Sequence, residues 1–269
     1  MSDVMRLDVA LTARGLAPSR SKAASWIEAG WVTVNGKCCK KSSVSVHMND
    51  VIVVSQTQRF VSRGGEKLLR AIETFGIELT NRVCMDVGAS TGGFTDCMLQ
   101  FGAQTVYAVD VGTNQLDTAL RSDPRVVNKE QFNFRYATPA DFPTLMDFAS
   151  VDVSFISLEK ILPSLFSLLS NKGEAVLLIK PQFEAGKEHL GKNGIVRSSS
   201  VHCQVIERVM QYSVAIGFAV LGCTYSPIKG SHGNVEYLLY VKKTEQDTRL
   251  FTVEAVKQIV AQAHKELRD

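Results

Sequence analysis

The sequence predicts an α/β protein with a doubly wound parallel sheet, and three observations lead to this fold class. A glycine-rich turn at residues 88–93 joins a short apolar run at 82–85 to a stretch with helical apolar spacing at 94–101. A second apolar run, residues 105–110, ends in the carboxylate of Asp110. Strands and helices then alternate to the end of the chain, and such alternation places helices on both faces of a parallel sheet.

The glycine-rich turn has the features of a nucleoside site. Glycine lets the backbone approach a ligand closely and adopt positive φ, and the helix that follows presents free N–H groups. An acid at the end of the next strand, here Asp110, accepts hydrogen bonds from ribose hydroxyls. Gly88, Gly92 and Gly93 do not follow the G-x-G-x-x-G spacing, which disfavours an NAD-dependent enzyme. For the turn taken alone, an ordinary strand–turn–helix connection is the alternative.

The other elements of this large domain follow from apolar periodicity. A helix is predicted at 66–75, ahead of the first strand. Ligands of a parallel sheet gather at the carboxyl ends of its strands, so we expect Asp110, Asp152 and Lys180 at one site. Further helices are expected at 114–121, 161–169, 201–216 and 251–266, and further strands at 126–127, 150–158 with its exit loop, 174–179, 219–224 and 237–241.

Composition excludes several classes of protein. The 269 residues suffice for one large domain or two, and 45% hydrophobic and 21% charged residues are ordinary for a globular protein. No apolar run approaches the roughly 18 residues of a membrane helix, and residues 1–14 lack a hydrophobic signal core. We therefore expect a cytoplasmic protein with no membrane partner. The six cysteines form no C-x-x-C pair and the five histidines are scattered, which predicts free thiols and no metal.

Charge is distributed unevenly along the chain. Residues 1–60 contain eight Arg and Lys against four Asp and Glu, a net charge of +4, whereas the remainder has 22 against 23, a net charge of −1. A small basic segment beside a nearly neutral domain suggests that the segment recruits a polyanion. A solvated charged face is the alternative reading of the same charges.

The N-terminal segment has its own pattern of elements. We expect helices at 5–14 and 20–29, a strand at 31–34 that enters a hairpin at Asn35-Gly36, and short strands at 44–46 and 51–54. The segment resembles the S4 RNA-binding domain, a small α+β fold. The matching residues are Arg6-Leu7-Asp8, Ser19-Arg20, Ala23, Ile27, Gly30, Val32 and Val34-Asn35-Gly36.

This resemblance implies that the second helix and the hairpin bind structured RNA. Basic side chains can contact phosphates without reading sequence, and folded RNA is recognised largely by shape. We place the S4-like domain at 1–58, a linker at 59–62 and the large domain at 63–269. The polar residues 55–58 also suit a joint. The predicted RNA-binding residues are Arg6, Arg14, Arg20, Lys22, Lys37, Lys40, Lys41 and Arg63.

The glycine-rich turn also carries a resemblance. It is similar to D-x-G-x-x-x-G-G-F/W-T of S-adenosylmethionine-dependent methyltransferases, specifically the FtsJ-like ones, which have a Rossmann-like fold. The resemblance implies S-adenosylmethionine as the cofactor. The implied cofactor-binding residues are Asp86, Gly88, Ala89, Ser90, Thr91, Gly92, Gly93, Phe94 and Asp110.

Four further positions resemble the Lys-Asp-Lys-Glu catalytic tetrad of FtsJ-like 2′-O-methyltransferases. Taken singly, a strand-end lysine is often a solvated one and a strand-end aspartate often caps a helix. Residues 62–65, 88–95, 152–157, 180–184 and 230–236 around the four resemble the hemolysin-A-type (TlyA) ribosomal RNA methyltransferases, in which an S4 domain precedes the FtsJ-like domain. The tetrad positions are Lys67, Asp152, Lys180 and Glu236.

The resemblance implies methylation of the ribose 2′-hydroxyl of cytidine in the RNA of ribosomal subunits. The transfer is an in-line displacement, and a lysine can help it as a base when neutral or by stabilising the alkoxide. By resemblance, Lys180 removes the proton, and Asp152 holds Lys180 and approaches the methyl-bearing sulfonium. Lys67 and Glu236 orient the ribose. An RNA-binding protein with weak or no activity is one alternative. A cytolysin, which the family name suggests, lacks sequence support, and the sequence gives no oligomeric state.

Overall fold

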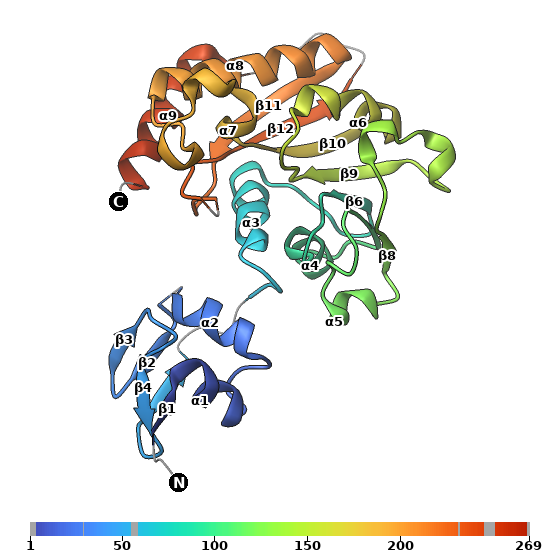
Figure 1. The fold of residues 1–269 in the computed structure, drawn as a ribbon. Helices are drawn as coiled ribbons and strands as arrows, with labels where there is room; N and C mark the ends of the chain where they lie inside the picture. The colour runs from blue at the N-terminus through green and yellow to red at the C-terminus, as the bar shows by residue number, and fades with distance from the viewer. Residues whose placement is uncertain (1–3, 29, 55–58, 231, 245–250, 268–269) are drawn as a thin grey trace. The chain divides into compact units, whose positions relative to one another are not determined.

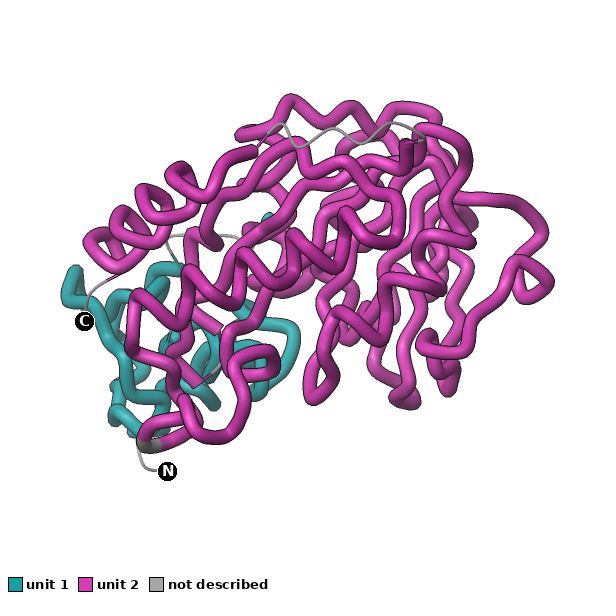
Figure 2. The backbone as a smooth tube through the Cα atoms, turned by 90° about the horizontal axis from the view of Figure 1, so that it is seen from above, with its two compact units in different colours: residues 1–59 teal, residues 60–269 magenta. Residues whose placement is uncertain are grey.

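The chain folds into two compact units, Met1–Arg59 and Phe60–Asp269 (Figure 2). The first unit contains one cluster of buried apolar side chains, and the second contains two. The polar joint predicted at residues 55–58 lies outside the described residues, as does Ala29, the predicted end of the second helix. The computed structural model describes residues 4–28, 30–54, 59–230, 232–244 and 251–267 (Figure 1).

The first unit combines two helices with two small antiparallel sheets. One sheet has the strand order β3-β2-β5 and the other pairs β1 with β4. Leu7, Leu11 and Ile27 are fully buried in its core, because they share the inward faces of the two helices. The elements are β1 Val4–Arg6, α1 Leu7–Ala13, α2 Arg20–Glu28, β2 Val32–Val34, β3 Lys37–Cys39, β4 Ser45–His47 and β5 Ile52–Val54.

The predicted hairpin is confirmed, whereas one strand of this unit was not foreseen. Asn35 and Gly36 have φ of 50° and 77°, the left-handed conformations that a two-residue hairpin loop requires. The predicted helix at 5–14 begins later, because Val4–Arg6 forms β1 and pairs with β4. Three residues are too few to show an apolar period, and the partner strand is distant in the sequence.

The second unit is built on a seven-stranded sheet with the order β11-β12-β10-β9-β6-β7-β8. The neighbours from β10 to β8 pair in parallel, as predicted. β12 pairs antiparallel with both β10 and β11, so it alone runs against the others. The strands are β6 Val83–Val87, β7 Thr105–Val109, β8 Val126–Lys129, β9 Met146–Val151, β10 Leu169–Ile179, β11 Phe218–Tyr225 and β12 Tyr237–Lys243.

Helices cover both faces of this sheet, which confirms the predicted fold class (Figure 1). One face packs against α6, α8 and α9, and the other packs against α3, α4 and α5. Within the described residues, no helix combines the length and apolarity needed to cross a membrane. The helices are α3 Gly64–Phe75, α4 Gly93–Gln100, α5 Thr118–Arg121, α6 Leu162–Leu168, α7 Pro181–Glu184, α8 Ser199–Ile216 and α9 Val253–Glu266, and the 3-10 turns are η1 Phe134–Tyr136, η2 Pro139–Asp141, η3 Leu158–Lys160, η4 Lys187–His189 and η5 Lys192–Gly194.

The helix predicted at 114–121 is shorter than expected. Its first residues do not form helical hydrogen bonds, because the backbone N–H groups of Asn114, Gln115 and Leu116 donate to the carboxylate of Glu130. The side chain of Asp117 then caps a single turn by accepting from the N–H of Ala119. A carboxylate from β8's exit loop therefore replaces the first turn of the predicted helix.

One edge of the sheet positions the site. Gly88, Asp110, Asp152 and Lys180 each directly follow the last residue of a parallel strand. Because β12 runs in the opposite direction, its first residue lies beside the last residue of β10. Glu236 directly precedes β12 and so reaches the same edge.

Candidate active site

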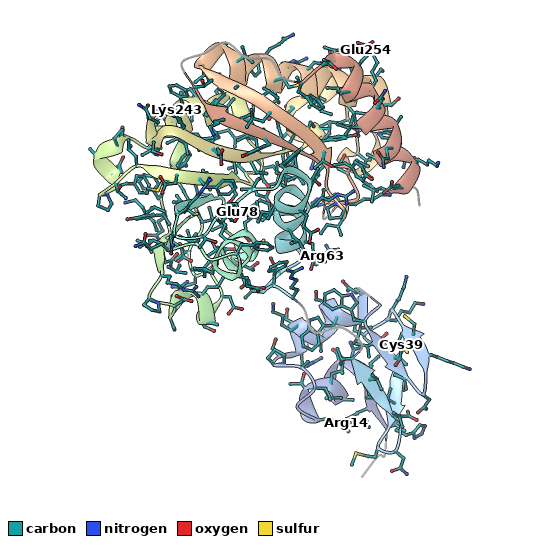
Figure 3. All side chains as sticks on the ribbon, turned by 180° about the vertical axis from the view of Figure 1, so that it is seen from behind. Arg14, Cys39, Arg63, Glu78, Lys243 and Glu254 are labelled. Atoms are coloured by element: carbon teal, nitrogen blue, oxygen red, sulfur yellow. The ribbon has the colours of Figure 1, made fainter. Side chains whose placement is uncertain are left out.

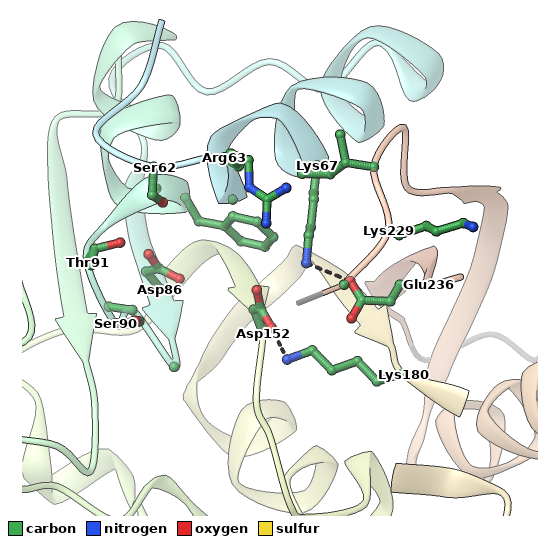
Figure 4. Close-up of a pocket in the computed structure, with 17 residues that line it drawn as sticks. Ser62, Arg63, Lys67, Asp86, Ser90, Thr91, Asp152, Lys180, Lys229 and Glu236 are labelled. Atoms are coloured by element: carbon green, nitrogen blue, oxygen red, sulfur yellow. Dashed lines mark hydrogen bonds and ion pairs between the residues drawn. The ribbon is translucent and has the colours of Figure 1, made fainter. Parts of the chain in front are cut away.

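The four predicted tetrad residues line one cavity of about 430 Å³ in the second unit. They come from four segments: Lys67 from α3, Asp152 from the end of β9, Lys180 from the end of β10, and Glu236 from the start of β12. Figure 4 shows the four side chains pointing toward one another. The structure thus brings together residues that the sequence separates by up to 169 positions.

Lys67 and Glu236 form a buried ion pair. Lys67 Nζ lies 2.6 Å from Glu236 Oε2, and the two side chains are 11% and 3% exposed. A Cβ atom at Gly230 would meet the Glu236 carboxyl group, which would have to shift to make room for it. The pair fixes α3 to the start of β12 across the cavity.

Lys180 has two oxygen partners at the opposite wall. Its Nζ lies 2.5 Å from Asp152 Oδ1 and donates a hydrogen bond of 2.9 Å to Ser154 Oγ. Among the described residues, Lys180 is the one charged partner that contacts this buried oxygen. Asp152 therefore carries a charge that is compensated but has acceptor capacity left.

The glycine-rich turn packs tightly against its neighbours. Gly88 has φ of 84° and touches the backbone carbonyl of Asp152, where a Cβ atom would collide. Gly93 touches Ser62 and the start of α3 in the same way. Gly92 has φ of 93° and faces leucine side chains instead of the cavity, so its role is to shape the turn. The predicted cofactor-binding residues that line the cavity of the tetrad are Asp86, Gly88, Ala89, Ser90, Thr91, Gly93 and Phe94.

Asp86 is the least solvated carboxylate of this cavity wall. It is 1% exposed, and its Oδ2 accepts from the N–H and Oγ1 of Thr95 at 2.8 and 2.7 Å, while Ser150 Oγ lies 3.2 Å from Oδ1. Burial raises the pKa of Asp86 to about 7, the negative charge of Asp152 adds to the rise, and the bonds from Thr95 and Ser150 oppose it. Asp86 thus fastens the start of α4 to β6.

A second cavity of about 390 Å³ adjoins the first and contains Asp110. Gly88, Ser90 and Asp152 line both cavities. The carboxylate of Asp110 accepts 2.7 Å hydrogen bonds from the N–H groups of Ser90 and Gly112, which hold the glycine-rich turn against the end of β7. Apolar side chains dominate the remaining wall, including Val111, Phe132, Phe134, Val153, Phe155 and Ile156.

Sequence reasoning missed several residues of these walls. Ser154 supports Lys180 directly, and Asn133 and Arg135 line the second cavity. The signal for Asn133 and Arg135 was their position after β8, since strand-end residues gather at this edge. Ser62, Ile228 and Lys229 also line the first cavity.

The predicted RNA-binding residues fall into the two units. Arg63 is exposed, precedes α3 and lines the cavity of the tetrad (Figure 3). Arg6 and Arg20 share Asp8, at 3.0 and 3.1 Å, and keep 50% and 62% of their side chains exposed. Hydrogen bonds from Arg6 keep the pKa of Asp8 below its ordinary value. Three further predicted RNA-binding residues of the first unit are exposed lysines: Lys37, Lys40 and Lys41.

Two other predicted RNA-binding residues, Arg14 and Lys22, are only partly exposed. The guanidinium of Arg14 donates to the backbone carbonyls of Asp50, His47 and Met48 at 2.7, 2.8 and 3.0 Å, so it stabilises the β4–β5 turn. Lys22 is half-buried on α2. In the part of the chain that the structure describes, no three His, Cys, Asp or Glu side chains gather as metal ligands.

The chain is similar to known proteins over nearly its whole length. Residues 60–243 match the FtsJ-like methyltransferase family and residues 5–52 match the S4 domain. YqxC of Bacillus subtilis, provisionally named an rRNA methyltransferase, is 46% identical over 98% of this chain and 95% of its own. The 16S/23S rRNA (cytidine-2′-O)-methyltransferase TlyA of Mycobacterium tuberculosis is 41% identical over 91% and 92%. A solved hemolysin-type structure from Streptococcus thermophilus is 47% identical, with a TM-score of 0.80 over 100% and 98%.

Proposed function

This chain belongs to the FtsJ-like methyltransferase family, and we propose that it methylates the ribose 2′-hydroxyl of cytidine in ribosomal RNA, with S-adenosylmethionine as methyl donor. One observation carries the proposal: two lysine–carboxylate pairs meet in a cavity that shares Gly88, Ser90 and Asp152 with a second cavity. Such an arrangement suits two reactants that approach each other from two sides. Because ribosomal subunits are the substrate, we expect the protein in the cytoplasm.

The residues of both cavities fit S-adenosylmethionine. The apolar wall around Asp110 suits a nucleoside, and the glycine-rich turn with Asp86 suits the amino-acid part. Asp152 lines both cavities and keeps 22% of its side chain exposed, so its carboxylate can face a neighbouring cation as well as Lys180. When bound, S-adenosylmethionine supplies an electrophilic methyl group on a positively charged sulfur.

The four tetrad residues divide the work on the acceptor ribose. Lys67 and Glu236, fixed to each other, orient the sugar, while Lys180 faces its 2′-oxygen. Lys180 would accept the hydroxyl proton as the 2′-oxygen takes the methyl group, and the sulfur of bound S-adenosylmethionine would keep the electron pair of the bond that breaks. Lys180 can accept this proton only as the neutral amine, so a cation bound beside Asp152 would have to compete with Lys180 for that carboxylate. Ser154 keeps Lys180 in place meanwhile.

The first unit supplies affinity for RNA in this proposal. Arg6 and Arg20 retain half or more of their side-chain surface and can reach phosphates. The S4 match over residues 5–52 and the rRNA substrates in the relatives' names support ribosomal RNA as the polyanion. Contacts of this kind position folded RNA without reading its sequence.

The experiment is transfer of tritiated methyl groups from S-adenosylmethionine to purified small and large ribosomal subunits. We expect label in the RNA, and resistance of the labelled linkage to alkali because the 2′-oxygen is blocked. Label confined to protein, or to bases that leave the linkage alkali-sensitive, would contradict the proposed reaction. Absence of transfer to naked RNA and to either subunit would favour an RNA-binding protein without activity.

The recruiting role is tested with the joint change of Arg20 and Lys22 to Ala. The apparent KM for subunits should rise, and the salt dependence of binding should flatten by roughly one unit of slope per lost phosphate contact. Affinity for S-adenosylmethionine should not change, because its proposed site lies in the second unit. Lys257→Ala, which removes a 63% exposed lysine of α9, is the matched control. An unchanged KM for the double variant would remove these residues from recruitment.

A further inference from the structure

The segment from Lys180 to Glu184 holds the loop 152–158 at three successive points. At the first point Lys180 contacts Asp152 and Ser154. At the second, the rings of Phe183 and Phe155 lie 5.0 Å apart. At the third, the carboxylate of Glu184 accepts two hydrogen bonds from the end of the loop.

Glu184 makes the firmest of these contacts. Its Oε1 accepts from the backbone N–H of Leu158 at 2.7 Å and its Oε2 accepts from Ser157 Oγ at 2.8 Å. The residue is 8% exposed, and Arg208 donates to its backbone carbonyl at 3.3 Å. Burial raises the pKa of Glu184, and the bonds from Leu158 and Ser157 oppose this rise. A carboxylate buried in this way stabilises the structure only while both donors remain in place.

The loop between these points has a conformation that needs support. Phe155 has φ of 63° although it is bulky, and the residue is 89% exposed, so its ring contact with Phe183 is a weak support compared with the polar contacts at the two ends of the loop. Strained backbone of this kind persists only where the surroundings fix it. The near end of the loop is fixed where the carbonyl of Asp152 meets Gly88, and the far end is fixed by Glu184.

We infer that Glu184 is a positioning residue for the methyl transfer, acting through Ser157 and Leu158 to hold Asp152 and Ser154 against Lys180. The inference rests on the proposed function. Glu184 lines neither of the two cavities, so its effect on the reaction passes through the loop. A displacement of the catalytic pair by an ångström is enough to slow a positioned reaction strongly.

The test compares kcat and KM for ribosomal subunits in four variants. Glu184→Ala loses both acceptors, and kcat should fall by about 10- to 100-fold with little change in KM. Glu184→Gln keeps an acceptor for the Leu158 N–H and can donate to Ser157 Oγ, so it should stay within about threefold of wild type. Ser157→Ala removes one bond and should lie between. The control Glu188→Ala removes a 73% exposed carboxylate and should match wild type.

A double-mutant cycle sharpens the test. If Glu184 acts through Ser157, then Ser157→Ala combined with Glu184→Ala should lower kcat no further than Glu184→Ala alone. Wild-type kcat in Glu184→Ala, or a loss confined to KM, overturns the inference while the proposed function stands. If Glu184→Ala does not fold, Ser157→Ala decides, since an unchanged kcat there overturns the inference. A wild-type protein without transfer activity overturns both the inference and the proposed function.

Discussion

The two lysine–carboxylate pairs of the cavity are alike in distance and unlike in enclosure. Nζ–O separations are 2.6 Å for Lys67–Glu236 and 2.5 Å for Lys180–Asp152, and each lysine side chain is 11% exposed. The carboxylates differ, because Glu236 is 3% exposed and Asp152 is 22% exposed. Asp152 also lines both cavities, whereas Glu236 lines one.

This difference in exposure favours a structural role for the pair Lys67–Glu236, here called the sealed pair, and a role in the reaction for the pair Lys180–Asp152, here called the open pair. A sealed pair cannot lose one member without leaving an unpaired charge in a poorly solvated place, so Lys67–Glu236 is suited to hold α3 and β12 together. In the more exposed pair, Lys180–Asp152, the carboxylate of Asp152 can turn to a bound ligand. The hydrogen bond to Ser154 then keeps Lys180 in place. We therefore propose that the proton transfer occurs at Lys180 and that Lys67 and Glu236 maintain the geometry around it.

The largest expected effect is that of Lys180→Ala. Loss of a proton acceptor in the transition state typically lowers a rate by about 10²- to 10⁴-fold, and we expect a fall in kcat of that size. The fold and S-adenosylmethionine affinity should persist, because the carboxylate of Asp152 reaches water once the lysine is gone. Single-turnover transfer and calorimetry measure the two quantities. A rate near that of wild type would remove Lys180 from the mechanism, and loss of folding would make it structural.

The second prediction compares stability between the pairs. Lys67→Met leaves Glu236 buried and uncompensated, which should lower the free energy of unfolding by about 3 kcal/mol. Lys180→Met, the matched change in the more exposed pair, should cost less, about 1 to 2 kcal/mol, because Asp152 keeps 22% of its side chain exposed. Adding Glu236→Gln to Lys67→Met should recover part of the loss without recovering activity. Urea unfolding measures these differences, and equal losses for the two methionine variants would show that enclosure does not distinguish the pairs.

Much of the fold followed from apolar runs, and what escaped depended on tertiary pairing. The central parallel strands β6, β7, β9 and β10 give apolar runs in the sequence because most of their residues are buried on both faces, whereas the edge strand β8 is partly exposed. The direction of β12 is not visible, since Tyr237–Lys243 reads the same in a parallel or an antiparallel neighbour. β1 required a partner strand distant in the sequence, and α5 lost its first turn to the carboxylate of Glu130.

For the site, the sequence indicated which residues gather but not how they pair. Strand-end positions and motif resemblance selected the tetrad, and the cavity contains all four members. The pairing of Lys67 with Glu236 across 169 positions follows only from the antiparallel β12. Glu184 lies in the segment 180–184 that carries the family resemblance, but nothing in the sequence indicated its role, because a glutamate after a strand is usually solvated and its burial depends on the loop it holds.

The smallest expected effect concerns Asp86. Its pKa responds to the carboxylate of one lysine–carboxylate pair, Asp152, and not to that of the other, Glu236. Burial and then the charge of Asp152 raise that pKa from 3.8 to about 7, while Glu236 is not among the groups that shift it. Between pH 4 and 7 the folded state therefore binds more protons than the unfolded state at this site. The contribution of Asp86 to stability is complete below pH 4 and is lost as pH rises through 7. Burial lowers the pKa of His202 to about 4, so its contribution to stability is lost in the opposite direction, as the pH falls from 6.5 to 4.

Differences between variants isolate Asp86, because His202 contributes equally to all of them. Asp152→Asn removes a like charge, so the pKa of Asp86 should fall and the loss of stability between pH 5 and 7.5 should shrink, by less than about 1 kcal/mol. Glu236→Gln should leave the slope unchanged even though it lowers stability at every pH. Asp86→Asn, which cannot titrate, should abolish this part of the slope in either background.

Urea unfolding at four pH values measures the slopes. If Glu236→Gln altered the slope as much as Asp152→Asn, the sealed pair would be coupled to the glycine-rich turn as strongly as the open one, and the division between a structural pair and a reactive pair would fail.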